Sequence, residues 1–302
     1  MPLGKVLRSN PTVRLRGYAE PMTTTVLVAV LTAALLHASW NAIAHGITDR
    51  FVGFGLISAG GTVCAGFLLP FTSLPDPASW PYLAVSVVLH VGYLAFLMLS
   101  YRLGDFGQVY PLARGLAPLV VTLAAALLIG ERLATSHLVG VLVVSGGLLS
   151  LVFVAGRPER SQTPAIAAAL GTGLMIASYT VIDGMGVRLS GDPFSYTIWL
   201  TFLHFVIFAV ALVALRGPSL FSQLRLSWWQ GLLGGAISIA AYGLVLWAQT
   251  QSPLAAIAAL RESSIVFGAI IGALFFREEF GRARILAAAA VTTGIVLLNL
   301  PD

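Results

Sequence analysis

The feature that most constrains this chain is a series of ten apolar runs, each about long enough to cross a bilayer as a helix. A hydrocarbon core about 30 Å thick needs about 20 apolar residues in helical conformation. The runs lie at 24–45, 51–73, 79–101, 107–129, 136–155, 164–184, 194–215, 229–250, 254–276 and 283–300. Only 10% of the 302 residues are charged, whereas a soluble domain has about a quarter. We therefore predict an all-α membrane protein with ten transmembrane helices.

Two segments share a spacing of charges that indicates an internal repeat. Arg114 and Arg261 each lie inside an apolar run, and each is followed 17 residues later by a glutamate, Glu131 or Glu278. In both places another apolar run comes next. Apolar helices resemble one another by chance, but two matched charges at one spacing make coincidence a weaker explanation than a repeat.

A second match lies earlier in each half, where ASWN at 38–41 resembles ASYT at 177–180. Each half has five apolar runs, and because five is an odd number the halves must insert with opposite orientation. We predict a basic, disordered tail at 1–23 and two inverted five-helix repeats at 24–156 and 163–301. Such symmetry places a binding site near the bilayer midplane, where the halves meet, and lets it face either side in turn.

The arginines outside the runs bear on the orientation in the membrane. If the termini were cytoplasmic, the cytoplasmic loops would hold only Arg132 and Arg188 besides the four basic residues of the tail. The opposite side would hold nine arginines: Arg50, Arg102, Arg157, Arg160, Arg216, Arg225, Arg277, Arg282 and Arg284. The positive-inside rule therefore favours termini on the outside. Met22 directly precedes the first run, so a native start at Met22 stays open beside Met1.

Several classes of function are disfavoured by the sequence. The positive charges stand singly between apolar runs and form no stripe, which argues against a nucleic-acid partner. Cys64 is the one cysteine, so neither an intramolecular disulfide nor a thiolate metal site is expected. We expect no cofactor, since no metal-ligand cluster and no phosphate-binding glycine loop occurs. A membrane-embedded enzyme and a non-transporting sensor or scaffold remain as alternatives to a carrier.

Four charged side chains fall inside the runs, namely Arg114, Asp183, Arg261 and Glu262. A charge at the bilayer centre costs about 2.5–3.5 kcal/mol on insertion scales, so each is expected to face a cavity or a partner. One interpretation is that Arg114 and Arg261 present guanidinium groups to a carboxylate, phosphate or phosphonate of a substrate. The other is an internal ion pair with Glu262 or Asp183. Both interpretations stay open, and a pair broken by substrate or proton would satisfy both.

The first run has a polar face. His37, Trp40 and Asn41 are spaced so that they lie on one side of a helix. The corresponding face of the sixth run consists of Tyr179, Thr180 and Asp183. We predict that these faces line a substrate cavity, with hydrogen bonds between helices as the alternative.

Other polar residues are assigned more simply. Tyr110 and Arg114 lie on a helix that contains Pro118 and is expected to line the pathway. His90 and His204 stand alone among apolar residues and are expected to pack. Glu262, Asp183 and His37 are candidate proton carriers, whereas Glu131, Glu278 and Glu279 lie at helix ends as caps or gates. The small-xxx-small motif at 268–272 predicts tight helix packing, with contact inside the protomer preferred.

Several of these motifs, taken together and in order, resemble the EamA-type branch of the drug/metabolite transporter superfamily. They are HASWNAIAH at 37–45, YPLARGLAP at 110–118 with GERL at 130–133, IASYTVIDGMGVR at 176–188, and PLAAIAALRE at 253–262 with FFREEF at 275–280. The resemblance covers 22–300. It implies ten helices in two inverted repeats and a central cavity, to whose lining it adds Tyr93, Tyr242, Trp247 and Gln249.

The resemblance also implies a function. The expected protein is a multi-pass secondary transporter of the cytoplasmic (inner) membrane that moves a small polar metabolite by alternating access, in the direction of efflux. The substrate class is an amino-acid-like or other small organic solute, with an anionic one favoured by the arginines, and protons are the candidate coupling ion. A monomer and a homodimer are both compatible with the sequence.

Overall fold

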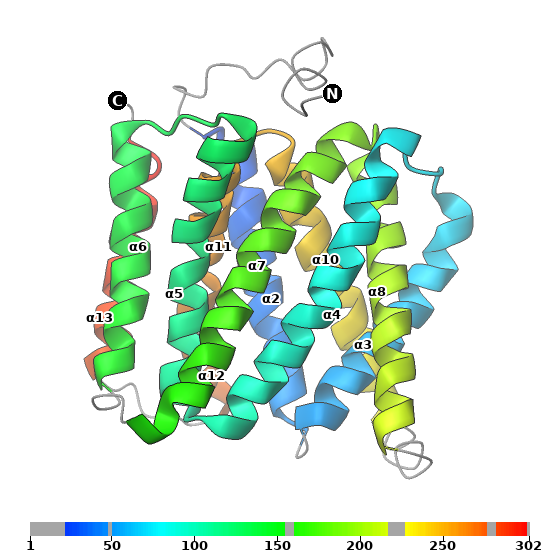
Figure 1. The fold of residues 1–302 in the computed structure, drawn as a ribbon, viewed down its shortest axis with the longest axis horizontal. Coiled ribbons are helices and arrows are strands. Elements are labelled where there is room, and N and C mark those ends of the chain that lie inside the picture. The colour runs from blue at the N-terminus through cyan, green and yellow to red at the C-terminus, as the bar shows by residue number, and fades with distance from the viewer. Residues whose placement is uncertain (1–21, 48–49, 155–159, 217–226, 277–281, 301–302) are drawn as a thin grey trace.

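The computed structural model describes residues 22–47, 50–154, 160–216, 227–276 and 282–300 (Figure 1). Within these ranges all regular secondary structure is helical, and nine helical segments are long and apolar enough to cross a membrane. One further apolar helix in the described part of the chain, Ile285–Leu297, is shorter. The predicted all-α membrane protein is therefore confirmed, with nine full-length spans among the described residues.

The long helices are α2 (Thr24–His45), α3 (Arg50–Leu68), α4 (Trp80–Leu103), α5 (Phe106–Ala124), α6 (Thr135–Val154), α7 (Thr163–Leu189), α8 (Pro193–Arg216), α10 (Trp228–Gln249), α11 (Leu254–Arg261), α12 (Ser264–Phe276) and α13 (Arg282–Leu297). Short helical turns are η2 (Leu69–Phe71), η3 (Pro77–Ser79), η4 (Ala125–Ile129) and η5 (Arg160–Gln162). The turn η4 is π-helical and continues α5 to the end of its predicted span.

The apolar run at 254–276 does not form one continuous helix. Between α11 and α12 the chain makes a turn at Glu262 and Ser263. The backbone N–H groups of these two residues bond to carbonyl oxygens three residues back, those of Ala259 and Leu260, at 3.1 Å each. Interrupted helices are tolerated inside a membrane where protein or a cavity surrounds them. That condition holds here, because residues 252–264 are all buried.

Short polar side chains begin three of the helices. Thr23, Asp105 and Asp192 each accept a hydrogen bond from a backbone N–H two or three residues later, at the starts of α2, α5 and α8. Such N-caps stabilise a helix by about 1 kcal/mol each. Burial alone would raise the pKa of Asp192, but hydrogen bonds from Ser195 and Phe194 outweigh it and hold the pKa below its ordinary value. Asp192 therefore caps α8 as a carboxylate.

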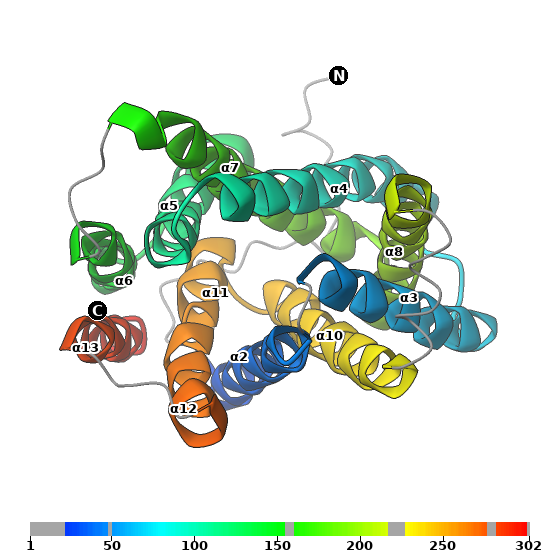
Figure 2. The same cartoon turned by 90° about the horizontal axis from the view of Figure 1, so that it is seen from below.

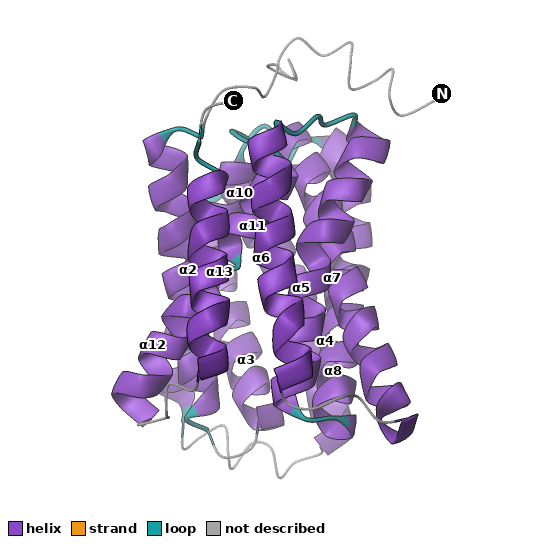
Figure 3. Cartoon of the chain, turned by 90° about the vertical axis from the view of Figure 1, so that its left-hand side faces the viewer, coloured by secondary structure: helices purple, strands orange, loops and turns teal. Residues whose placement is uncertain are grey.

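The helices stand side by side in a bundle (Figures 1 and 3). α4 packs along α7, and α10 packs along both α2 and α3. α6 pairs with α13 at one end of the bundle, and α3 pairs with α8 at the other (Figure 2). α5 lies against α6, α7 and α11, while α12 lies against α2. Of these packed pairs, all except α5 with α6 join a helix of the first half of the sequence to a helix of the second half.

Glycines permit the closest of these contacts. A Cβ atom on Gly231 of α10 would lie 2.6 Å from the carbonyl oxygen of Leu56 on α3, and one on Gly235 would overlap the backbone of Gly61. The preference for contact inside the protomer at the motif 268–272 is not met at its first position. A Cβ on Gly268 would meet no described atom within 4 Å, so Gly268 makes no tight contact within the described chain.

Large apolar side chains lie on the surface and charged side chains lie in the interior, which is the reverse of the arrangement in a soluble protein. Large apolar side chains point outward, with exposed fractions of 73% for Phe67, 75% for Leu127 and 77% for Phe275. Because lipid is the solvent around these helices, such exposure stabilises the fold rather than threatening it. The four charged side chains inside the runs are instead buried, as the sequence predicts.

Candidate functional site

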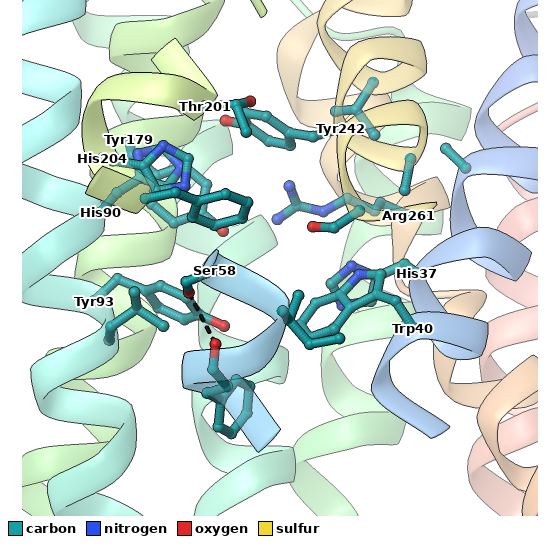
Figure 4. A pocket seen from close by; sticks show the side chains of 18 residues that line it. His37, Trp40, Ser58, His90, Tyr93, Tyr179, Thr201, His204, Tyr242 and Arg261 are labelled. Carbon is teal, nitrogen blue, oxygen red and sulfur yellow. Dashed lines mark hydrogen bonds between the residues drawn. The ribbon is translucent and has the colours of Figure 1, made fainter. Parts of the chain in front are cut away.

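A cavity of about 100 Å³ lies in the middle of the bundle, between helices of the two halves (Figure 4). α2, α3 and α4 line one part of it, and α7, α8, α10 and the end of α11 line the rest. Its polar lining consists of His37, Ser58, His90, Thr201, His204, Ser238 and Arg261, and its aromatic lining of Trp40, Phe54, Tyr93, Tyr179, Phe205 and Tyr242. A central cavity between the halves agrees with the expectation from the sequence.

Among the described residues Arg261 supplies the one cationic group of this lining. It is the last residue of α11, so the helix break places its side chain at the cavity wall (Figure 4). No carboxylate of the described chain lies within 4 Å of its guanidinium group. Its Nε is buried and has no hydrogen-bond partner among the described residues. A buried guanidinium in this state is suited to bind an anionic group.

Arg114 has a different environment. Its Nε lies 2.7 Å from Oε2 of Glu262, and its Nη2 donates a hydrogen bond of 2.8 Å to the hydroxyl of Ser264. Its guanidinium carbon lies 5.9 Å from the centre of the Tyr110 ring. Both members of the ion pair are almost fully buried, and neither lines the cavity. The interpretation as an internal ion pair thus applies to Arg114, whereas Arg261 has no ion-pair partner in the described part of the chain.

Two histidines that were expected only to pack form a wall of the cavity. The ring of His90 stacks on Tyr179 at 4.1 Å and on His204 at 4.7 Å, measured between centroids. Nδ1 of His90 lies 2.9 Å from the carbonyl oxygen of Ser86, and Nδ1 of His204 lies 2.8 Å from that of Leu200. Because a carbonyl oxygen can only accept, each Nδ1 carries the proton in the neutral ring, which leaves Nε2 as an acceptor.

The predicted site residues divide between the lining and the layer behind it. Six of the thirteen line the cavity: His37, Trp40, Tyr93, Tyr179, Tyr242 and Arg261. The other seven do not: Asn41, Tyr110, Arg114, Thr180, Asp183, Trp247 and Glu262. The side chains of Asn41 and Thr180 donate to carbonyl oxygens of their own helices, at 2.7 Å each. Trp247 packs in an apolar cluster with Val245 and Leu260.

Asp183 lies directly behind the lining. It is fully buried, and the hydroxyl groups of Tyr196 and Tyr242 donate hydrogen bonds to its two oxygens, the first at 3.2 Å. Tyr242 lines the cavity, whereas Tyr196 does not. The carboxyl group is therefore separated from the cavity by a hydroxyl group rather than exposed to it.

A second polar cluster closes the end of the bundle near the termini. Both terminal nitrogens of Arg188 lie 3.2 Å from Oε1 of Glu131, and the same carboxylate accepts from the backbone N–H of Leu254 at 3.0 and 3.2 Å. Arg188 also donates to the carbonyl oxygens of Gln249 and Ser252, at 2.8 and 3.1 Å. Four helix ends, those of η4, α7, α10 and α11, are thereby tied together.

Burial shifts the pKa of the carboxyl group in this cluster. Removal from water raises the pKa of Glu131 above its ordinary value, and the effect exceeds the opposing pull of Arg188 and of the N–H groups of Leu254 and Ala255. Glu131 was expected to be a cap or gate, and it does cap the start of α11 from the other half of the chain. Glu278 and Glu279, for which the same role was expected, lie outside the described residues.

No group of three or more histidine, cysteine, aspartate or glutamate side chains among the described residues is placed to hold a metal ion.

The cavity residues that the sequence did not indicate include Phe54, Ser58, Phe205 and Ser238 besides the two histidines. For His90 and His204 a signal was present, because an ionisable side chain within a span is a candidate functional residue by default.

Comparisons with known proteins agree with this architecture. Residues 163–300 match the model of the EamA-like transporter family. The uncharacterized protein PA1977 of Pseudomonas aeruginosa is 33% identical over 187 residues, which span 60% of this chain and 61% of that protein. A solved crystal structure matches with a TM-score of 0.74 and 20% sequence identity, covering 91% of this chain and 96% of the other. At that identity the structural match shows a shared fold.

Proposed function

We propose that this chain is a secondary transporter of a small anionic or zwitterionic metabolite. Its residues 163–300 belong to the EamA-like transporter family, as the resemblance predicts. Transport is by alternating access across the cytoplasmic membrane, in the direction of efflux. The observation that carries the proposal is the buried guanidinium group of Arg261, which faces the cavity without an ion-pair partner in the described chain.

The charge balance of the cavity favours a carboxylate-bearing substrate. Arg261 lines the cavity and no aspartate or glutamate does so among the described residues. A desolvated guanidinium group without a counter-ion is costly, and a bound carboxylate restores the balance with two parallel hydrogen bonds. Binding of substrate therefore supplies the partner that Arg114 already has in Glu262.

The opposite wall suits the rest of an amino-acid-like molecule. The neutral rings of His90 and His204 offer acceptor nitrogens for an ammonium or hydroxyl group, and the faces of Tyr179 and Tyr242 attract a cation. The volume of about 100 Å³ restricts the substrate to a small solute. Ser58, Thr201 and Ser238 add hydroxyl groups that bind donors or acceptors.

The helix contacts support two inverted repeats, at 24–156 and 163–301, as the basis of alternating access. The repeat matches α2 with α7, α3 with α8 and α4 with α10. Under this match the contact of α4 with α7 corresponds to the contact of α10 with α2, and both contacts occur. The contact of α3 with α10 becomes that of α8 with α4, and both occur as well. Such pairing supports rocking of one half against the other around the cavity.

The position of the cavity supports efflux. On α2 and α3 the lining residues extend to Trp40 and Phe54, toward the connection between these helices, while the Arg188–Glu131 cluster ties the opposite end together. The helix ends that carry Arg50, Arg102, Arg216 and Arg282 lie at the end where α2 and α3 are connected, and the positive-inside rule assigns this end to the cytoplasm. The arrangement therefore suits a carrier that takes its substrate from the cytoplasm.

Thermal unfolding of the purified protein with a set of small carboxylates, amino acids and matched amides tests the proposal. A ligand that binds the folded state raises the midpoint, by an amount that grows with its concentration. We expect a shift for one or more carboxylates, none for their amides, and loss of the shift in Arg261→Ala. The control is Arg102→Ala, which removes an exposed arginine outside the cavity. An equal shift in Arg261→Ala would refute the assignment of Arg261.

A further inference from the structure

A second buried ionisable group without an ion-pair partner in the described part of the chain is the carboxyl group of Asp183. It is 0% exposed, and among the described residues no lysine or arginine lies within 4 Å of it. Glu262, by contrast, has Arg114 at 2.7 Å. A buried carboxylate without a cation is energetically unfavourable, and such a group avoids this penalty by taking up a proton.

The surroundings of Asp183 contain hydroxyl groups rather than charges. The groups that face it are Ser86 of α4, Tyr196 of α8, Tyr242 of α10 and, at longer range, Tyr179 of α7 and Arg261 of α11. α5 also packs against α7, but Arg114, the buried charge of α5, is neutralised by Glu262. Three hydroxyl groups stabilise the carboxylate in part, so both charge states are accessible.

The route between Asp183 and the cavity is open to a proton and closed to a larger ligand. Tyr242 lines the cavity and donates its hydroxyl hydrogen to Oδ2 of Asp183. A second connection runs through the hydroxyl of Ser86, which lies 3.1 Å from Nδ1 of the cavity residue His90. Asp183 itself does not line the cavity, so a substrate cannot reach its oxygens.

We propose that Asp183 is the proton-binding site of this carrier and that Tyr242 is the hydroxyl group through which the proton enters and leaves. The proposal rests on the proposed transport function and names its coupling site. In the loading step a hydronium ion in the cavity gives a proton to the Tyr242 oxygen, while the original Tyr242 proton moves to Oδ2 of Asp183. The hydronium ion loses one O–H bond and leaves as water. One O–H bond breaks and one forms at Tyr242, one forms at Asp183, and the carboxyl group becomes neutral.

The alternatives to Asp183 fit the observations less well. Protonation of Glu262 would leave Arg114 as a buried cation without a counter-ion. His37 lies within electrostatic reach of Arg114 and Arg261, which oppose a further positive charge. Asp183 has neither obstacle. In the alignment of the two halves Ala44 stands opposite Asp183, so the first half has no equivalent carboxyl group.

The test uses the full chain in proteoliposomes on a solid-supported membrane, with protons as the probe and no substrate present. A step to lower pH should give a transient inward current as protons enter the site. We expect this current in the wild type and in Asp192→Asn, which alters a carboxylate outside the spans, and its loss in Asp183→Asn. A current that persists in Asp183→Asn overturns the proposal, and so does a wild type without a current.

A second measurement keeps the proposal testable if Asp183→Asn does not fold. The C=O stretch of a protonated carboxyl group is visible by infrared difference spectroscopy of a pH titration. Tyr242→Phe removes one hydrogen bond to Asp183 and should shift this band and slow the current, whereas Asp192→Asn should do neither. An unshifted band in Tyr242→Phe refutes the site. A proton current without any carboxylate-induced thermal shift would count against the proposed substrate and not against Asp183.

Discussion

The Nε of Arg114 and Oε2 of Glu262 form an ion pair of 2.7 Å that joins the first half of the chain to the helix break in the second half. Arg261, which the repeat places opposite Arg114, is adjacent to the same glutamate in sequence and yet has no ion-pair partner among the described residues. Arg114 is thus held in an internal ion pair, whereas Arg261, at the matching position of the proposed repeat, lines the cavity.

This difference predicts unequal effects on stability. Arg114→Ala leaves Glu262 as a buried charge without a partner, which costs about 3–5 kcal/mol. Arg261→Ala breaks no ion pair, so its cost should be clearly smaller. The measurement is the thermal unfolding midpoint of both variants in one detergent. The double variant Arg114→Leu with Glu262→Leu should recover much of the loss, because it removes both charges. Equal midpoints for the two single variants would contradict the assignment.

The Arg188–Glu131 cluster predicts a gate at the end of the bundle near the termini. Arg188→Ala removes four hydrogen bonds that hold α7 to the ends of η4, α10 and α11, and should increase opening at that end. The measurement is the rate at which an impermeant thiol reagent labels Val245→Cys, a cavity position, in a Cys64→Ser background. We expect faster labelling from the side of the termini.

The controls separate gating from general loosening. Arg188→Lys keeps the charge but cannot make the same set of bonds, and should give an intermediate rate. Arg102→Ala, an exposed site away from the cluster, should leave the rate unchanged. Labelling that rises equally from both sides would indicate loss of structure and not a gate.

The raised pKa of Glu131 predicts how stability depends on pH. Burial makes the folded protein hold this proton more tightly than the unfolded chain, so the folded state binds more protons between the ordinary carboxyl pKa of about 4.3 and the raised value. Stability from this group is therefore present below that window and is lost as pH rises through it. Glu131→Gln, which cannot ionise, should be stabilised relative to the wild type as pH increases. Parallel midpoint curves for the two proteins would contradict this.

Much of the fold is predictable from sequence because hydropathy is a local property. Runs of about 20 apolar residues specify spans whatever their neighbours are. The burial of Asp183 and Glu262 follows equally from the cost of exposing a charge to lipid. The break after Arg261 is not visible in this way, since PLAAIAALRE reads as continuous apolar helix. Next to the break α11 packs against α2, α5 and α6, and the sequence does not specify such contacts locally.

The cavity lining was harder to predict for a related physical reason. A helix that is apolar all round has no polar stripe to mark the face that turns inward. His90 and His204 therefore looked like isolated packing residues, although their rings stack on each other in the cavity wall. The error for Asn41 and Thr180 was the opposite: they were predicted to line the cavity and do not. Their polar groups instead donate hydrogen bonds to carbonyl oxygens of their own helices.

The contact between α3 and α10 predicts a strong effect of single methyl groups. Gly231→Ala would place a Cβ 2.6 Å from the carbonyl oxygen of Leu56, an atom of the backbone that cannot rotate away. Overpacking of this kind costs about 1–3 kcal/mol, against a gain of about 1 kcal/mol from the better helix propensity of alanine. A lower unfolding midpoint is therefore expected. Gly146→Ala is the matched control, because a Cβ there meets no described atom within 4 Å and the propensity gain should prevail. If both variants shift the midpoint in the same direction, the close approach of α3 and α10 does not limit stability.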